Sequence, residues 1–65
     1  MERTYTHRGV TFTVRLNARP GRRMQWTFTA PTATGSGVTG FGMEVAFRNG
    51  KDAGEAAIDR QMDGS

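Results

Sequence analysis

The stretch Met24-Gln25-Trp26-Thr27-Phe28-Thr29-Ala30 alternates apolar and polar residues without a break. A period of two predicts a β-strand with one buried face and one open face. The stretch holds the single tryptophan of the chain, and we expect it to lie between two other strands. Its core side would then carry Met24, Trp26, Phe28 and Ala30, and its open side Gln25, Thr27 and Thr29.

A second alternation comes earlier in the chain, over residues 10–17. Its apolar side consists of Val10, Phe12, Val14 and Leu16. Between the two alternations, Pro20-Gly21 predicts a tight turn, because proline fixes one φ and glycine accepts a positive one. The short connection predicts that the two strands pair as an antiparallel hairpin.

The flanking regions give weaker patterns. Residues 1–8 are interpreted as a polar lead-in anchored by Tyr5, and residues 31–40, rich in glycine and small hydroxylated residues, as a flexible loop. A third alternation over residues 41–48 predicts the third strand. Its inward residues would be Phe41, Met43, Val45 and Phe47.

The last part of the chain predicts a helix over residues 52–62, with Asn49 as its amino-terminal cap and Gly64 as its end. Its apolar side consists mainly of Ala53, Ala57, Ile58 and Met62. Glu55, Asp59 and Asp63 are spaced four apart and repel one another, so packing or a cationic partner must hold the helix. The alternative is that residues 49–65 are only partly ordered.

These elements predict an α+β fold for residues 1–65 as a single small domain. The sheet would be a three-stranded antiparallel β-meander with one C-terminal α-helix packed on one face, in the order β-β-β-α. A chain of 65 residues buries only about 60% of its unfolded surface, and self-association would add burial. No cysteine is present, so disulfides and thiolate metal sites are excluded. With no apolar leader or membrane-length segment, we expect a cytoplasmic protein with no membrane contact.

The charge is unevenly distributed along the chain. The formal net charge is +3, but residues 1–48 carry seven arginines and two glutamates, a charge of +5, and residues 49–65 carry −2. A basic region of this kind can bind polyanions. The alternative is compositional: eight of the nine basic residues are arginine, a bias that a GC-rich genome produces without any ligand.

Residues that could carry catalysis are sparse. His7 is the only histidine, and only Glu2 lies near it in sequence, so we expect a solvated or capping histidine and no metal site. Most carboxylates lie on the solvent side of the predicted helix, where ordinary pKa values are expected. The aromatic residues share the core phase of the strands, which argues against base stacking. The sequence therefore predicts no enzyme activity, no cofactor and no metal.

The open side of the predicted sheet has hydroxyl, amide and guanidinium groups, which commonly contact phosphates and base edges. Its residues would be Thr11, Thr13, Arg15, Gln25, Thr27, Thr29, Glu44 and Arg48. Arg19, Arg22 and Arg23 crowd the hairpin tip at one end of this surface. The alternative is that threonine simply suits exposed strand positions, and Glu44 within the same face would repel phosphate.

His7-Arg8-Gly9-Val10 and Asp52-Ala53-Gly54-Glu55-Ala56-Ala57-Ile58-Asp59 resemble stretches of plant AP2 domains and of integrase amino-terminal domains. That resemblance implies a three-stranded sheet backed by an alanine-rich helix, with DNA bound through the sheet and Arg15, Arg23 and Gln25 facing it. The chain also resembles small uncharacterised bacterial proteins with a Tyr-x-x-Arg-Gly-Val/Tyr opening, an aromatic middle strand and a terminal helix. This second resemblance implies no activity.

Two functions follow as hypotheses. The first is a non-enzymatic protein-binding or regulatory module that meets another protein or a second copy of itself through exposed sheet edges. The alternative is nucleic-acid binding, with DNA as the ligand. The residues expected to make that contact are Arg15, Arg19, Arg22, Arg23 and Gln25.

Overall fold

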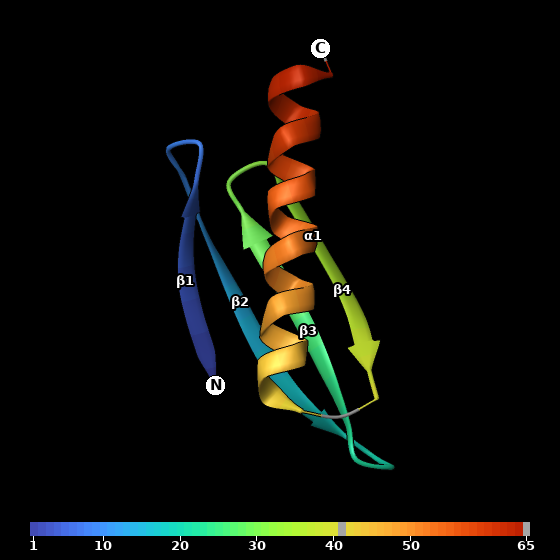
Figure 1. Ribbon diagram of the computed structural model, residues 1–65. Coiled ribbons are helices and arrows are strands. Elements are labelled where there is room, and N and C mark those ends of the chain that lie inside the picture. The colour runs from blue at the N-terminus through green and yellow to red at the C-terminus, as the bar shows by residue number, and fades with distance from the viewer. Residues whose placement is uncertain (41, 65) are drawn as a thin grey trace.

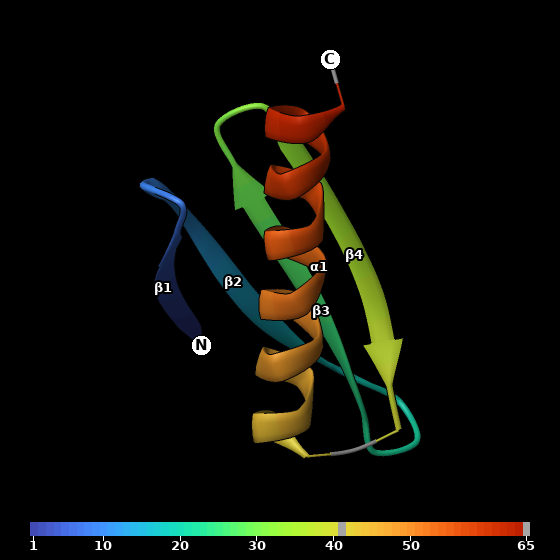
Figure 2. The same ribbon diagram turned by 45° about the horizontal axis from the view of Figure 1, so that its top comes forward.

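The computed structural model of the chain describes residues 1–40 and 42–64. It contains the strands β1 (Glu2–His7), β2 (Val10–Arg19), β3 (Arg23–Ala30) and β4 (Ala33–Thr39), followed by the helix α1 (Met43–Asp63). The strands form one antiparallel sheet in the order β1-β2-β3-β4, and α1 covers one face of it (Figure 1, Figure 2). An α+β fold with an antiparallel sheet and a C-terminal helix is therefore confirmed, but the sheet has four strands and not three.

The hairpin of β2 and β3 forms the centre of the sheet, as the alternating sequence predicted. Leu16 faces Trp26 across the pair, and Val14 faces Phe28. Both strands direct their apolar residues toward α1, where Val14 and Phe12 are almost completely buried. Trp26 is half-buried on this side and packs against the core.

The prediction that residues 1–8 form a polar lead-in is wrong, because Glu2–His7 is the edge strand β1. Tyr5 faces Phe12, and the rings of this pair lie 5.7 Å apart. Arg8 and Gly9 form the two-residue turn into β2, with φ values of 54° and 79°, as a type I′ hairpin turn requires. The apolar content of β1 is low because this edge strand packs against α1 largely through charged side chains.

The prediction of a loop over residues 31–40 is also wrong, since Ala33–Thr39 pairs with β3 as β4. Gly35 faces Phe28, and Gly37 faces Trp26. A Cβ at Gly37 would lie 2.4 Å from Trp26 Cζ2, and one at Gly35 would lie 2.5 Å from Phe28 Cε2. Gly35 and Gly37 are typical of a loop in the sequence, but they are required in this strand because aromatic rings of β3 cover them.

The third strand predicted over residues 41–48 is replaced by the first turns of α1. Phe41 lies outside the described residues, while Met43 and Val45, predicted to point inward, are 41% and 39% exposed. Asn49, the predicted cap, lies within α1, which begins at Met43. The predicted end is confirmed, because Gly64 follows the last helical residue and its N–H donates to the carbonyl of Arg60 at 2.8 Å.

Small residues determine how closely α1 packs on the sheet. The buried face of the helix includes Ala46, Gly50, Gly54 and Ala57, spaced by four, four and three positions. A Cβ at Gly50 would lie 2.5 Å from Val14 Cγ1, so only glycine permits this approach. This stripe of small residues places α1 directly on β2 and β3, and it leaves the opposite side of the sheet uncovered.

Candidate functional site

The side chains that point away from α1 form a polar surface across all four strands, which we call the open face. Its central row consists of Thr4, Thr13, Thr29 and Thr34, each facing the next across a strand pair. The adjacent row consists of Glu2, Arg15, Thr27 and Ser36. The open face is therefore a regular array of hydroxyl groups with one arginine in it.

The β2–β3 hairpin extends this array to a basic end. Asn17 faces Gln25, and Arg19 faces Arg23, so all four share the alternation of the open face. Arg22 lies in the turn with φ 61°, after Gly21 with φ 78°. We call Arg19, Arg22 and Arg23 the hairpin end; it lies at the same end of the molecule as the start of α1 (Figure 1, Figure 2).

The structure thus places all five predicted site residues on the β2–β3 hairpin, with Arg19, Arg22 and Arg23 together at its end. The hairpin end makes no ion pair with any residue in the described part of the chain. Arg15 lies apart from it along β2, and its NH2 group is 3.1 Å from Glu2 Oε1. A shallow hollow of about 330 Å³ lies beside this pair, lined by Glu2, Thr13, Arg15 and Thr29.

Glu44 and Arg48 were predicted on the open face, and the structure places both on α1 instead. Glu44 forms a bidentate pair with Arg3, with N–O distances of 3.0 and 2.8 Å, and this contact lowers the pKa of the Glu44 carboxyl. Among the described residues, Glu2 is the only carboxylate on the open face. The predicted repulsion between Glu44 and phosphate on this face therefore does not arise.

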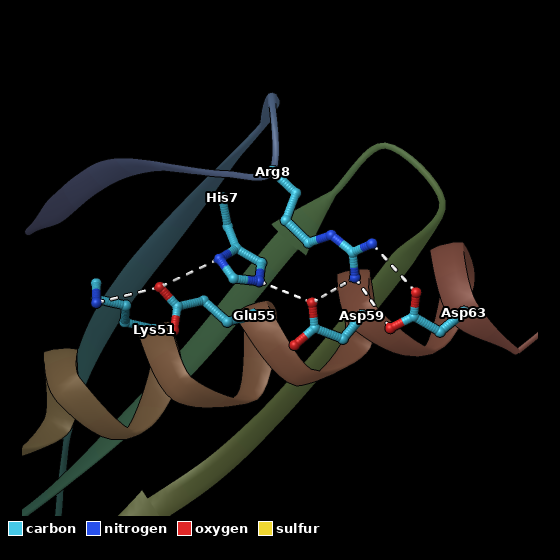
Figure 3. Close-up of polar contacts among 6 residues, drawn as sticks. All are labelled: His7, Arg8, Lys51, Glu55, Asp59 and Asp63. Atoms are coloured by element: carbon cyan, nitrogen blue, oxygen red, sulfur yellow. Dashed lines mark hydrogen bonds and ion pairs between the residues drawn. The ribbon is translucent and has the colours of Figure 1, made fainter.

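A second polar cluster joins β1 to α1 (Figure 3). We call it the β1–α1 clamp, and it consists of His7, Arg8, Lys51, Glu55, Asp59 and Asp63. His7 Nε2 lies 2.8 Å from Asp59 Oδ1, so the imidazole N–H donates to the carboxylate. Arg8 NH1 donates to Asp59 Oδ1 at 3.1 Å, and the guanidinium also contacts both oxygens of Asp63. Lys51 Nζ lies 3.1 Å from Glu55 Oε2 on the same side of α1.

The clamp corrects two predictions made from the sequence. His7 is not a solvated residue, because its side chain is 26% exposed and bonded to α1. The pKa of Asp59 is lowered, first by the hydrogen bond from His7 and then by the one from Arg8, so this carboxyl is not ordinary. The sequence left the cationic partner of the acidic helix undetermined, and Arg8 of the β1–β2 turn in the same chain pairs with both Asp59 and Asp63.

The clamp connects β1 and the β1–β2 turn to α1. No Ser or Thr hydroxyl in the described residues forms a hydrogen bond with His7. Within residues 1–40 and 42–64, no three ligating side chains are placed to hold a metal ion. In this geometry the clamp fixes β1 to α1 and offsets the repulsion between Asp59 and Asp63.

No family model matches this chain, and neither a curated protein nor a solved structure matches it. Across the described residues, no helix combines the length and the apolar character needed to cross a membrane.

Proposed function

We propose that this chain is a non-enzymatic binding module whose open face and hairpin end bind duplex nucleic acid, with DNA as the expected ligand. The observation that carries the proposal is the pairing of the arginines. Arg3, Arg8 and Arg15 each meet a carboxylate, whereas the hairpin end has no carboxylate partner among the described residues. Arg48 and Arg60 on α1 also form no ion pair there, but only the hairpin end groups three such arginines within five positions. Unpaired guanidinium groups are available to neutralise phosphates.

The shape of the hairpin suits a groove. The major groove of B-DNA is about 12 Å wide and admits a two-stranded β-ribbon. Two paired strands lie about 4.8 Å apart, so β2 and β3 together fit this width. Asn17 and Gln25 then present amide groups to base edges, while Arg19 and Arg23 reach the phosphates on either side.

Duplex is favoured over single-stranded nucleic acid by the position of the aromatic residues. Binding to single strands relies on aromatic side chains that stack on the bases. Tyr5, Phe12, Trp26 and Phe28 all lie on the side of the sheet that faces α1. The open face offers threonine hydroxyls in their place, which contact phosphate and sugar. The resemblance to AP2 and integrase amino-terminal domains supports the same surface, since it points to Arg15, Arg23 and Gln25.

Fluorescence anisotropy with a labelled random duplex tests the proposal. We expect a Kd of about 10⁻⁴ to 10⁻⁶ M near physiological salt, which weakens steeply as salt rises from about 50 to 200 mM. A single strand of the same length should bind more weakly. Absence of binding at the lowest salt concentration would remove the proposal, and so would a preference for the single strand.

A protein-binding or self-associating module is the alternative function. The observation that favours it is the outer edge of β4, which pairs with no strand among the described residues. Analytical ultracentrifugation tests self-association separately from the anisotropy titration, because DNA binding by the hairpin does not require the edge of β4.

A further inference from the structure

The two edges of the sheet differ in how they are protected. Edge strands of soluble proteins usually carry charges, prolines or bulges that prevent pairing with another chain. β1 has Glu2, Arg3 and His7, and both Arg3 and His7 are bonded to α1. β4 has the sequence Ala-Thr-Gly-Ser-Gly-Val-Thr, without a charge or a proline. β4 is therefore the unprotected edge.

The core side of β4 also leaves the approach of another strand clear. Gly35 and Gly37 project no side chain there, and the rings of Phe28 and Trp26 lie over them from within the same chain. On the other side of the strand, Val38 is 53% exposed. The edge strand thus has no charge and one exposed apolar side chain.

The flank of α1 nearest to β4 is similarly uncharged over its middle turns. The ion pairs of α1 reach β1, on one side of the helix, and β4 lies on the other side (Figure 1, Figure 2). At 100° per residue, the flank away from those ion pairs includes Asn49 and Ala53 in the middle turns and Arg60 near the end of the helix.

We propose that β4 pairs antiparallel with β4 of a second copy of this chain, which joins the two sheets into one of eight strands around a twofold axis. Pairing over the full strand centres the axis on Ser36, the middle of its seven residues. Thr34 of each copy then faces Val38 of the other, and Gly35 faces Gly37. The second copy is the favoured occupant because β4 brings no like charges together when it pairs with itself.

The antiparallel arrangement also fits the charge distribution. It places the hairpin ends of the two copies at opposite ends of the assembly, so their arginines do not repel one another. The added contact increases the burial of a chain whose described residues include only nine buried hydrophobic side chains. The dimer does not depend on nucleic-acid binding, although it would join the two open faces into one surface.

Sedimentation velocity of the wild type, Ser36→Lys and Thr4→Lys tests the dimer. Both substitutions add one lysine at an exposed position of an edge strand, but only Ser36→Lys places two ammonium groups opposite each other in the proposed dimer. We expect dimers for the wild type and Thr4→Lys, and at least a tenfold weaker dimer for Ser36→Lys with an unchanged circular dichroism spectrum. A monomeric wild type at the highest soluble concentration overturns the proposal, and so does a Ser36→Lys chain that dimerises as tightly as Thr4→Lys.

If Ser36→Lys fails to fold, chemical cross-linking still tests the dimer. The chain has no cysteine, so Ser36→Cys and Thr4→Cys each introduce a single thiol. A short bismaleimide should join two Ser36→Cys chains efficiently and leave Thr4→Cys chains largely single. Equal yields from the two variants would contradict a twofold axis at Ser36.

Discussion

Gly54 of α1 lies against Phe12 of β2 so closely that a Cβ at position 54 would come within 2.5 Å of Phe12 Cε2. Phe12 is only 1% exposed, so its ring has no free space into which it can move. The contact fixes the distance between the helix and the sheet, and a larger residue at either position must separate the two layers.

Gly54→Ala is expected to destabilise the protein although alanine favours helix. The helix propensity gain is about 1 kcal/mol, whereas overpacking a buried contact costs about 1–3 kcal/mol, so we expect a net loss of up to about 2 kcal/mol. Urea denaturation measures this loss. Gly40→Ala is the matched control, since nothing lies within 4 Å of a Cβ there and little change is expected. A Gly54→Ala chain about 1 kcal/mol more stable than the wild type, as helix propensity alone would give, would show that the layers are not in close contact.

Alanine substitutions at Gly35 and Gly37 should have different effects because their covering rings differ in burial. Phe28 over Gly35 is 5% exposed and cannot yield, so Gly35→Ala should cost about 1–3 kcal/mol. Trp26 over Gly37 is half-buried and can turn toward solvent, so Gly37→Ala should cost less and shift the tryptophan emission to the red. Equal losses of stability, or an unshifted emission in Gly37→Ala, would contradict this packing.

The alternation of residues 10–17 and 24–30 was sufficient to predict the central hairpin and which side of it is buried. Both strands lie inside the sheet, where every second residue meets the helix, so their period of two is complete. The open face and the basic hairpin end followed from the same alternation. The part of the candidate site on β2 and β3 could therefore be predicted, whereas the parts contributed by β1 and β4 could not. Glu44 and Arg48, which were predicted on this face, lie on α1.

β1, β4 and the first turns of α1 could not be predicted. Their apolar residues either fit both the strand period of two and the helix period of about 3.6, or fit neither. Phe41, Met43, Val45 and Phe47 alternate, yet Phe47, Gly50, Gly54 and Ile58 also fit one face of a helix, and glycines within a helix weaken that pattern. The sequence of β4 resembles that of a loop, because the need for glycine at these positions comes from aromatic rings on β3. β1 has few apolar residues because ion pairs hold it to α1.

Acid should weaken the β1–α1 clamp. His7 and Arg8 hold the pKa of Asp59 below its ordinary value, so the folded chain binds fewer protons than the unfolded chain as this group titrates. The clamp's contribution to stability is full above the unfolded pKa of about 3.9 and is lost as pH falls through the lower folded pKa. Asp59→Asn should therefore lower the Tm at neutral pH, and the difference from wild type should close in acid.

Asp52→Asn is the control for this titration, since Asp52 is exposed and forms no ion pair within the described residues. Its Tm should follow that of the wild type at every pH. A Tm difference between Asp59→Asn and wild type that persists under strongly acidic conditions would exclude titration of Asp59 as the cause.

Glu2→Gln should strengthen nucleic-acid binding. The substitution removes the only described carboxylate of the open face and releases Arg15 from its pair at 3.1 Å. An exposed pair of this kind contributes only about 0–1 kcal/mol to stability, so the fold should be retained. Glu44→Gln removes the same charge from α1 and is the matched control. Equal effects of the two variants on the Kd would show that net charge, and not the open face, determines affinity.

The salt dependence of duplex binding by two double variants tests the central claim most directly. Arg19→Ala/Arg23→Ala removes two guanidinium groups from the hairpin end, and Arg48→Ala/Arg60→Ala removes two from exposed positions on α1, so each lowers the formal charge from +3 to +1. For Arg19→Ala/Arg23→Ala we expect about tenfold weaker binding at low salt and a salt slope reduced by about two, as the loss of two phosphate contacts requires. Arg48→Ala/Arg60→Ala should keep a slope close to that of the wild type. Equal weakening by the two variants would contradict the assignment of the hairpin end as the site of contact.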